Sequence, residues 1–212
     1  MEHSWSWGAI VLLGAWHGIN PGMGWLFAVA LGLQERKGTA VWRALPPLAL
    51  GHGLAIAAVL LLAALVGLVV PPQYLKWLVV VVLLGFGTYR LVCHRHPRFG
   101  GMRVGARDLT IWSFLMASAH GAGLMVLPFV LALGSSTHAM GPHAGHHIGI
   151  GSPALALAAT LLHSGAYLLV AALVAWAVYD RLGLRLLRQA WFNLDLAWAV
   201  ALMGTGGITA LM

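Results

Sequence analysis

The sequence predicts an all-α integral membrane protein in which six transmembrane helices form a 3+3 inverted-topology repeat with broken first and fourth helices. Three observations predict it: an apolar composition, six long apolar segments, and a likeness between the two halves of the chain. Of 212 residues, 60% are hydrophobic and 8% are charged, and the mean hydropathy is strongly positive. This composition cannot supply an ordinary water-facing surface, so a soluble domain is excluded.

Six segments are long enough to cross a bilayer, which takes about 20 apolar residues each. The first begins without a basic region or a small-residue cleavage site, so we expect a retained helix rather than a removed signal peptide. Charged or Pro/Gly-rich breaks separate the six from one another. We therefore expect helices at 8–33, 45–69, 73–91, 109–134, 153–179 and 191–211.

The basic residues predict the orientation in the membrane. Eleven of the twelve Lys and Arg residues fall on one side of the predicted helices, and only Lys76 falls on the other. The positive-inside rule places the loops after the first, third and fifth helices in the cytoplasm of a multi-pass inner-membrane protein, with both termini outside. The net charge of +7 follows from this orientation and gives no reason to expect nucleic acid as a partner. The basic residues of the cytoplasmic loops are Arg36, Lys37, Arg43, Arg90, Arg95, Arg98, Arg103, Arg107, Arg181, Arg185 and Arg188.

The two halves of the chain resemble each other helix by helix. The first helix contains GAWHGINPGMGWLF and the fourth MASAHGAGLMVLPF; the second and fifth each carry one histidine at comparable depth; the third and sixth share a Gly-x-Gly near the end. Because three is odd, the second copy crosses the membrane in the opposite direction, as in many secondary transporters. We expect a first repeat at 1–91, a basic cytoplasmic linker at 92–108, and a second repeat at 109–212.

The first helix carries a break in the stretch HGINPG. Pro21 removes a backbone donor, so a carbonyl near His17 loses its helical partner. In lipid, such groups are tolerated only where protein buries them or a wet cavity hydrates them. At helical spacing His17, Asn20 and Gly24 share one face, and the break can bring Met23 to the same place. The stretch is typical of a binding site.

Histidines at membrane depth are the candidate ligands. Ionisable residues in spanning helices are costly and face a cavity or a partner, and imidazole is a common ligand of transition metals. Carboxylates are scarce; Asp195 alone lies within a predicted helix, either as a cap or in proton coupling. The candidate metal ligands are His17, Asn20, Met23, His52, His120 and His163, although each histidine could instead be an interhelical hydrogen bonder.

Further histidines lie in the predicted loops. The outside loop 138–147 is rich in histidine and glycine, which is typical of metal recruitment but also fits a polar loop of accidental composition. Its candidate recruiting residues are His138, His143, His146 and His147. On the cytoplasmic side, CHRH at 93–96 is a weaker candidate for a metal exit point, and its lone cysteine excludes an internal disulfide.

HGINPG resembles the His-Gly-x-x-Pro-Gly-His signature of the NicO-type nickel/cobalt permeases, part of a wider lysine exporter-like superfamily. The resemblance implies translocation of nickel or cobalt, with His17 as the carried-over functional residue. Met23 stands where the family's second histidine would be, and a thioether ligand favours a softer ion such as copper(I). The HxxxxDH pattern of the uptake branch is missing.

The sequence thus predicts a transporter for a transition-metal cation, nickel or cobalt first and copper or zinc next. The expected partners are the lipid bilayer and the metal, and a homo-oligomer or a partner membrane component is left open. The alternative is a haem-binding membrane electron carrier with two axial histidines. We expect no enzyme, because a metal-dependent hydrolase would have no general base other than histidine.

Overall fold

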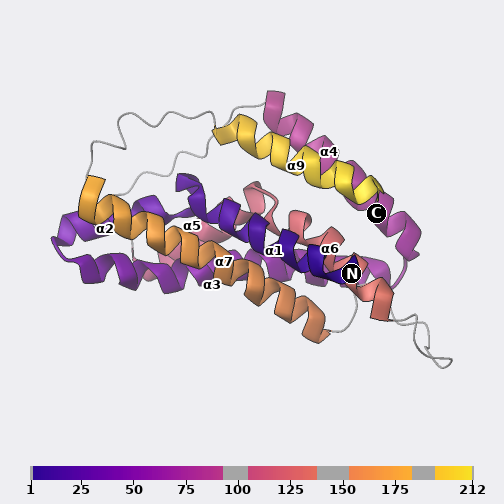
Figure 1. Cartoon of the computed structure of the whole chain (residues 1–212), viewed down its shortest axis with the longest axis horizontal. Coiled ribbons are helices and arrows are strands. Elements are labelled where there is room, and N and C mark those ends of the chain that lie inside the picture. The colour runs from indigo at the N-terminus through magenta and orange to yellow at the C-terminus, as the bar shows by residue number, and fades with distance from the viewer. Residues whose placement is uncertain (1, 93–104, 138–152, 183–193, 212) are drawn as a thin grey trace.

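The computed structural model describes residues 2–92, 105–137, 153–182 and 194–211, and all regular secondary structure in these ranges is helical (Figure 1). The first half contains α1 (Glu2–Ile19), the 3-10 turn η1 (Pro21–Met23), α2 (Trp25–Glu35), α3 (Gly38–Gly67) and α4 (Pro72–Val92). The second half contains α5 (Ala106–Ala119), α6 (Ala122–Thr137), α7 (Pro153–Ala177), the π turn η3 (Val178–Leu182) and α9 (Leu194–Leu211).

Two described helices are long and apolar enough to cross a membrane, Gly38–Gly67 and Pro153–Arg181. The pair α5 and α6, bent by 63°, makes a third if it is one span. Three other apolar helices are shorter: Trp25–Glu35, Tyr74–Tyr89 and Trp198–Leu211. The architecture is therefore all-helical and membrane-like, and six spans stay a prediction.

Side chains are distributed as lipid demands. On α3 and α7, large aliphatic residues point outward: Leu61, Leu62, Leu161 and Leu169 are each more than half exposed. Polar residues face inward instead, among them His17, His52 and His163, which are fully buried. A water-soluble bundle shows the opposite distribution, because its surface must be polar. The exposed apolar belt is what a hydrocarbon surrounding requires.

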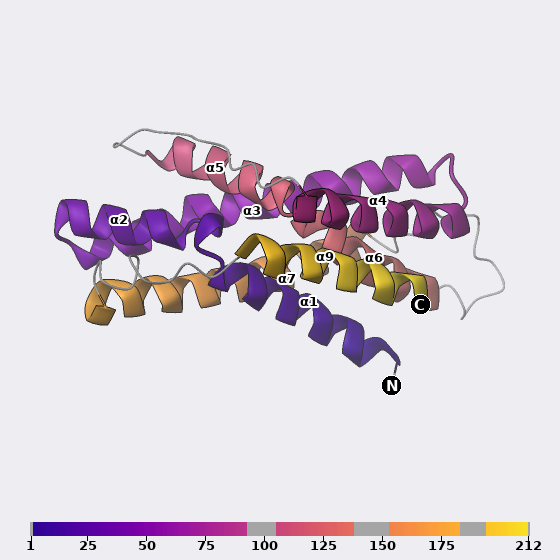
Figure 2. The same cartoon turned by 90° about the horizontal axis from the view of Figure 1, so that it is seen from above.

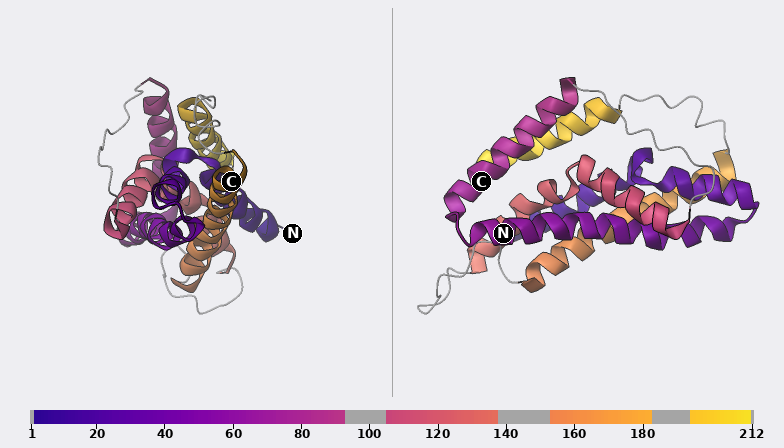
Figure 3. Two further views of the ribbon diagram at one scale, coloured as in Figure 1. Left: turned by 90° about the vertical axis from the view of Figure 1, so that its left-hand side faces the viewer. Right: turned by 180° about the vertical axis from the view of Figure 1, so that it is seen from behind.

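Helices of one half pack mainly on helices of the other. The most extensive contacts join α1 to α7, α3 to α5, and α4 to α9, and α3 also crosses α7 (Figures 1 and 2). Seen from behind, α4 and α9 form a pair set to one side of the other helices (Figure 3). Close approach depends on small residues, as in other membrane bundles. A Cβ added at Gly18 would lie 2.6 Å from the Tyr167 carbonyl oxygen.

Both predicted interruptions are observed. In the first, Asn20 is extended, Pro21 begins η1, and Gly24 takes the left-handed conformation (φ 118°) before α2. In the second, α5 ends at Ala119 with His120 as its C-cap, and Gly121 (φ 70°) turns the chain into α6. Positive φ costs glycine little, which explains why glycine stands at each bend.

The predicted helix ends need correction in two places. The first segment starts at Glu2 rather than residue 8, and α3 starts at Gly38 rather than residue 45. The sequence prediction treated the charged and proline-containing stretch here as a break between helices. Instead, Pro46 and Pro47 lie inside α3. Interior prolines are tolerated in membrane helices where neighbouring groups satisfy the freed carbonyls.

Candidate functional site

Three of the four predicted intramembrane histidines meet ring to ring. His17 comes from α1, His52 from α3 and His163 from α7, and all three are fully buried. The ring centroids are 5.4 Å apart for His17 and His52, 5.0 Å for His17 and His163, and 5.4 Å for His52 and His163. We call these residues the three-histidine cluster. It lies where the α1–α7 contact meets α3.

Backbone carbonyls define the tautomers of two of these rings. Nδ1 of His17 lies 2.7 Å from the Leu13 carbonyl oxygen, and Nδ1 of His163 lies 3.1 Å from that of Ile10. A carbonyl only accepts, so each Nδ1 carries the hydrogen and donates it, and each Nε2 carries a lone pair. Metal-binding histidines are commonly oriented in this way, by a second-shell acceptor on the other nitrogen.

Four nitrogens of the cluster have no partner within the described part of the chain. They are Nε2 of His17, Nε2 of His163 and both ring nitrogens of His52. A buried polar atom without a partner costs about 1–3 kcal/mol, so such groups are rare and call for an explanation. These nitrogens belong to three rings that contact one another, which makes the cluster a candidate place for a ligand.

The distances between the three ring centroids resemble those of imidazoles around one bound ion. Three imidazoles sharing one tetrahedral ion, with metal–nitrogen bonds of about 2.1 Å, have ring centroids about 5 Å apart. The cluster has this spacing. Among the described residues, however, no group of three or more His, Cys, Asp or Glu is placed to hold a metal ion as it stands. Binding would therefore require the rings to turn, whereas the helices are already close enough.

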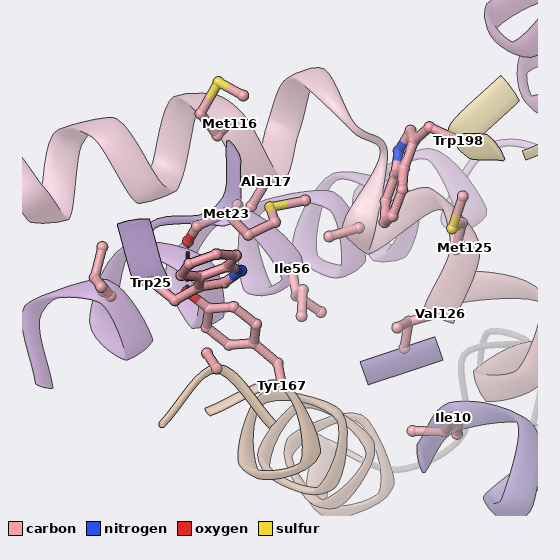
Figure 4. Packing of buried hydrophobic residues seen from close by; sticks show 14 of the residues in the cluster. Ile10, Met23, Trp25, Ile56, Met116, Ala117, Met125, Val126, Tyr167 and Trp198 are labelled. Carbon is pink, nitrogen blue, oxygen red and sulfur yellow. Dashed lines mark hydrogen bonds between the residues drawn. The ribbon is translucent and has the colours of Figure 1, made fainter. Parts of the chain in front are cut away.

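Tyr167 holds the cluster against the first helix break. Its ring stacks on His52 with centroids 4.1 Å apart. Its hydroxyl donates to the Met23 carbonyl oxygen at 2.7 Å (Figure 4). Sequence reasoning missed this residue. The signal was its position four residues after His163, which puts both side chains on the same face of α7.

Trp198 joins the cluster to the second break. Its ring packs edge-to-face on His17 and on His120, with centroids 4.5 and 5.0 Å apart, and its Nε1–H donates to the His120 carbonyl oxygen at 2.7 Å. Nδ1 of His120 lies 2.7 Å from the Met116 carbonyl oxygen. Sequence reasoning missed Trp198 too, although a tryptophan in the middle of a span needs a buried acceptor for its N–H.

Aromatic donors satisfy carbonyls at both breaks. At the first, Trp25 donates to Ile19, Trp112 to Gly22 and Tyr167 to Met23, with distances of 2.9, 3.2 and 2.7 Å. At the second, Trp198 donates to His120. The breaks are thus held by side chains, as non-helical backbone at membrane depth requires.

Asn20 and Met23 lie differently from the expected helical face. Residues 21–23 form a 3-10 turn, so the uniform helical spacing that placed Asn20 beside His17 does not apply. The Asn20 side chain caps this turn by accepting the Gly22 N–H at 2.9 Å. The Met23 side chain is buried among apolar residues of the core (Figure 4). Their roles as metal ligands stay predictions.

The remaining predicted residues fall outside what the structure describes. These are the CHRH stretch and the recruiting residues His138, His143, His146 and His147. Asp195 lies in the first turn of α9, but its side chain is outside the described part.

Comparison of the chain with models of known protein families, with curated proteins and with solved structures finds no match.

Proposed function

We propose that the protein is a membrane transporter for a transition-metal cation, nickel or cobalt first and copper or zinc next. The observation that carries this proposal is the three-histidine cluster, whose four unpartnered nitrogens are buried between three helices. We assign His17, His52 and His163 as the substrate site. His120 is a second station on the same path.

The surroundings favour a borderline ion over a hard one. None of the buried polar residues that the structure describes is Asp, Glu, Lys or Arg. Calcium and magnesium are bound by oxygen ligands, mainly carboxylates, whereas imidazole suits nickel, cobalt, copper and zinc. Imidazole also accepts protons, so protonation of the cluster would release the ion.

We further propose six spans arranged as an inverted repeat in the inner membrane, with both termini outside. The packing supports this. If a two-fold axis relates the halves, the contact of α1 with α7 has as its equivalent the contact of α5 with α3, and α4 with α9 is its own equivalent. These are the three most extensive contacts in the described chain. Alternating access would come from one repeat rocking against the other.

The ring packing favours a metal substrate over haem. A porphyrin between two axial histidines needs a flat slot between their rings. Here the His52 ring is in contact with His17, His163 and Tyr167. No such slot is open between these rings.

Flux through the purified protein tests the proposed function. Proteoliposomes should take up nickel(II) or cobalt(II) saturably, and excess calcium or magnesium should compete weakly, because the site is built from nitrogen ligands. The measurements are elemental analysis of the purified protein and time courses of metal uptake. Protein-free liposomes of the same lipid are the control. Uptake no faster than in these liposomes for nickel, cobalt, copper and zinc would reject a transport function.

A further inference from the structure

Trp198 occupies an unusual position in the proposed path. It is buried, with 2% of its surface exposed, and its indole contacts both His17 of the three-histidine cluster and His120. An indole ring has a donor N–H but no lone pair available to a metal, so it cannot pass on an ion. A residue of this kind, in contact with two ligating rings, acts as a barrier rather than as a ligand.

The helix that carries Trp198 is set apart from the helices that carry the cluster. Helix α9 packs chiefly on α4, and this pair lies beside the rest of the bundle (Figures 1 and 3). The pair meets the bundle at the second break. A Cβ added at Gly121 would lie 2.9 Å from Leu202 Cδ2 of α9 and 3.6 Å from the Phe86 ring of α4. Movement of the α4–α9 pair would therefore act directly on residues 120 and 121.

One hydrogen bond couples this movement to the path. The Nε1–H of Trp198 donates a hydrogen bond to the carbonyl oxygen of His120. His120 is the last residue before Gly121, which has a left-handed conformation. The second break has no proline at the bend itself; Gly121 turns the chain there, and the Trp198 donor satisfies the His120 carbonyl oxygen. Withdrawing the indole would remove its hydrogen bond to the His120 carbonyl oxygen and its ring contact with His17 in a single step.

We propose that Trp198 is the gate between the three-histidine cluster and His120, and that displacement of the α4–α9 pair opens it. This inference rests on the proposed function for the identity of the ion. The closed gate accounts for the full burial of the His17 ring, which Trp198 contacts in this structure. A population of open states set by helix displacement is the usual basis of gating in transporters.

Thiol labelling tests the gate without metal. In a Cys93→Ser background, a single cysteine replaces His52, and a membrane-impermeant thiol reagent is added on both sides of the reconstituted protein. Trp198→Ala should speed labelling of this cysteine about tenfold or more, because opening no longer requires the indole to leave. Trp198→Phe keeps a ring in place but lacks the N–H donor, so it should speed labelling less than Trp198→Ala does.

Trp112→Ala is the matched control. Trp112 also donates its indole N–H to a break carbonyl, that of Gly22 at the first break, and its ring packs on Phe27. It should leave labelling unchanged. Trp198→Leu, which leaves a smaller void, serves if the alanine variant does not fold, and it should shift labelling in the same direction. Unchanged labelling in both Trp198→Ala and Trp198→Leu, or equal acceleration in Trp112→Ala, would overturn the gate.

Metal uptake by the protein with native Trp198 separates the two proposals. If metal is taken up but Trp198→Ala does not speed labelling, the transport function stands and the gate is rejected. If Trp198→Ala speeds labelling but the protein neither takes up nor binds nickel, cobalt, copper or zinc, the barrier at Trp198 stands and the metal function is rejected.

Discussion

Replacing His17 by alanine should abolish metal transport and weaken equilibrium metal binding by more than about a hundredfold, while the protein stays folded. His17 contacts both other rings of the cluster, and its Nε2 is one of the unpartnered nitrogens. Two remaining imidazoles leave the coordination shell incomplete, and the apolar side chains nearby cannot complete it. Cobalt(II) titration of the purified variant, followed by visible absorption, measures the loss.

His120→Ala is the matched control for this prediction. His17 and His120 each place Nδ1 2.7 Å from the carbonyl oxygen four residues earlier, so the two substitutions remove the same local hydrogen bond. His120→Ala should slow flux but change the affinity of the cluster by less than about threefold, because His120 is a separate station. Equal loss of affinity in the two variants would place His120 in the same site as His17. Unchanged metal affinity in His17→Ala would show that the three-histidine cluster has a structural role and does not bind the metal.

Gly14→Ala and Gly51→Ala should each lower the melting temperature by about 5 °C or more. A Cβ at Gly14 would collide with the His163 carbonyl oxygen of α7, and one at Gly51 with the Thr110 carbonyl oxygen of α5. Both obstacles are backbone atoms of a packed helix, which cannot rotate away as a side chain can. The helices must separate, so Gly14→Ala should also weaken metal binding by moving His17 away from His163.

Gly8→Ala is the control in the same helix as Gly14. A Cβ at Gly8 meets nothing within 4 Å. Since alanine favours helix over glycine by up to about 1 kcal/mol, this variant should be as stable as the parent or slightly more so. The measurement is thermal unfolding of the three variants in one detergent. Equal melting temperatures for Gly14→Ala and Gly8→Ala would show that α1 does not pack on α7 as described.

The sequence predicted the breaks because their causes are local. Pro21 and the flanking glycines interrupt the first helix whatever surrounds them, and Gly121 does so in the fourth. His17, His52 and His163 were candidate ligands because of their depth in the predicted spans, and the structure places their rings in contact. Their role as metal ligands stays a prediction.

Contacts between distant residues could not be predicted in the same way. Tyr167 bonds to a carbonyl 144 positions earlier, and Trp198 to one 78 positions earlier. Neither partner follows from helical periodicity, which relates residues only within a few turns. The start of α3 was misplaced for a related reason, because the prolines inside it are tolerated by tertiary surroundings and not by local preference.

The central claim is that the three-histidine cluster binds the transported metal. X-ray absorption spectroscopy of the cobalt- or nickel-loaded protein tests it most directly, because imidazole rings give a recognisable outer-shell scattering pattern. We predict about three imidazole nitrogens at about 2.1 Å in the parent, and a loss of imidazole scattering in His17→Ala. A first shell of oxygen or sulfur without imidazole, unchanged by His17→Ala, would contradict the account.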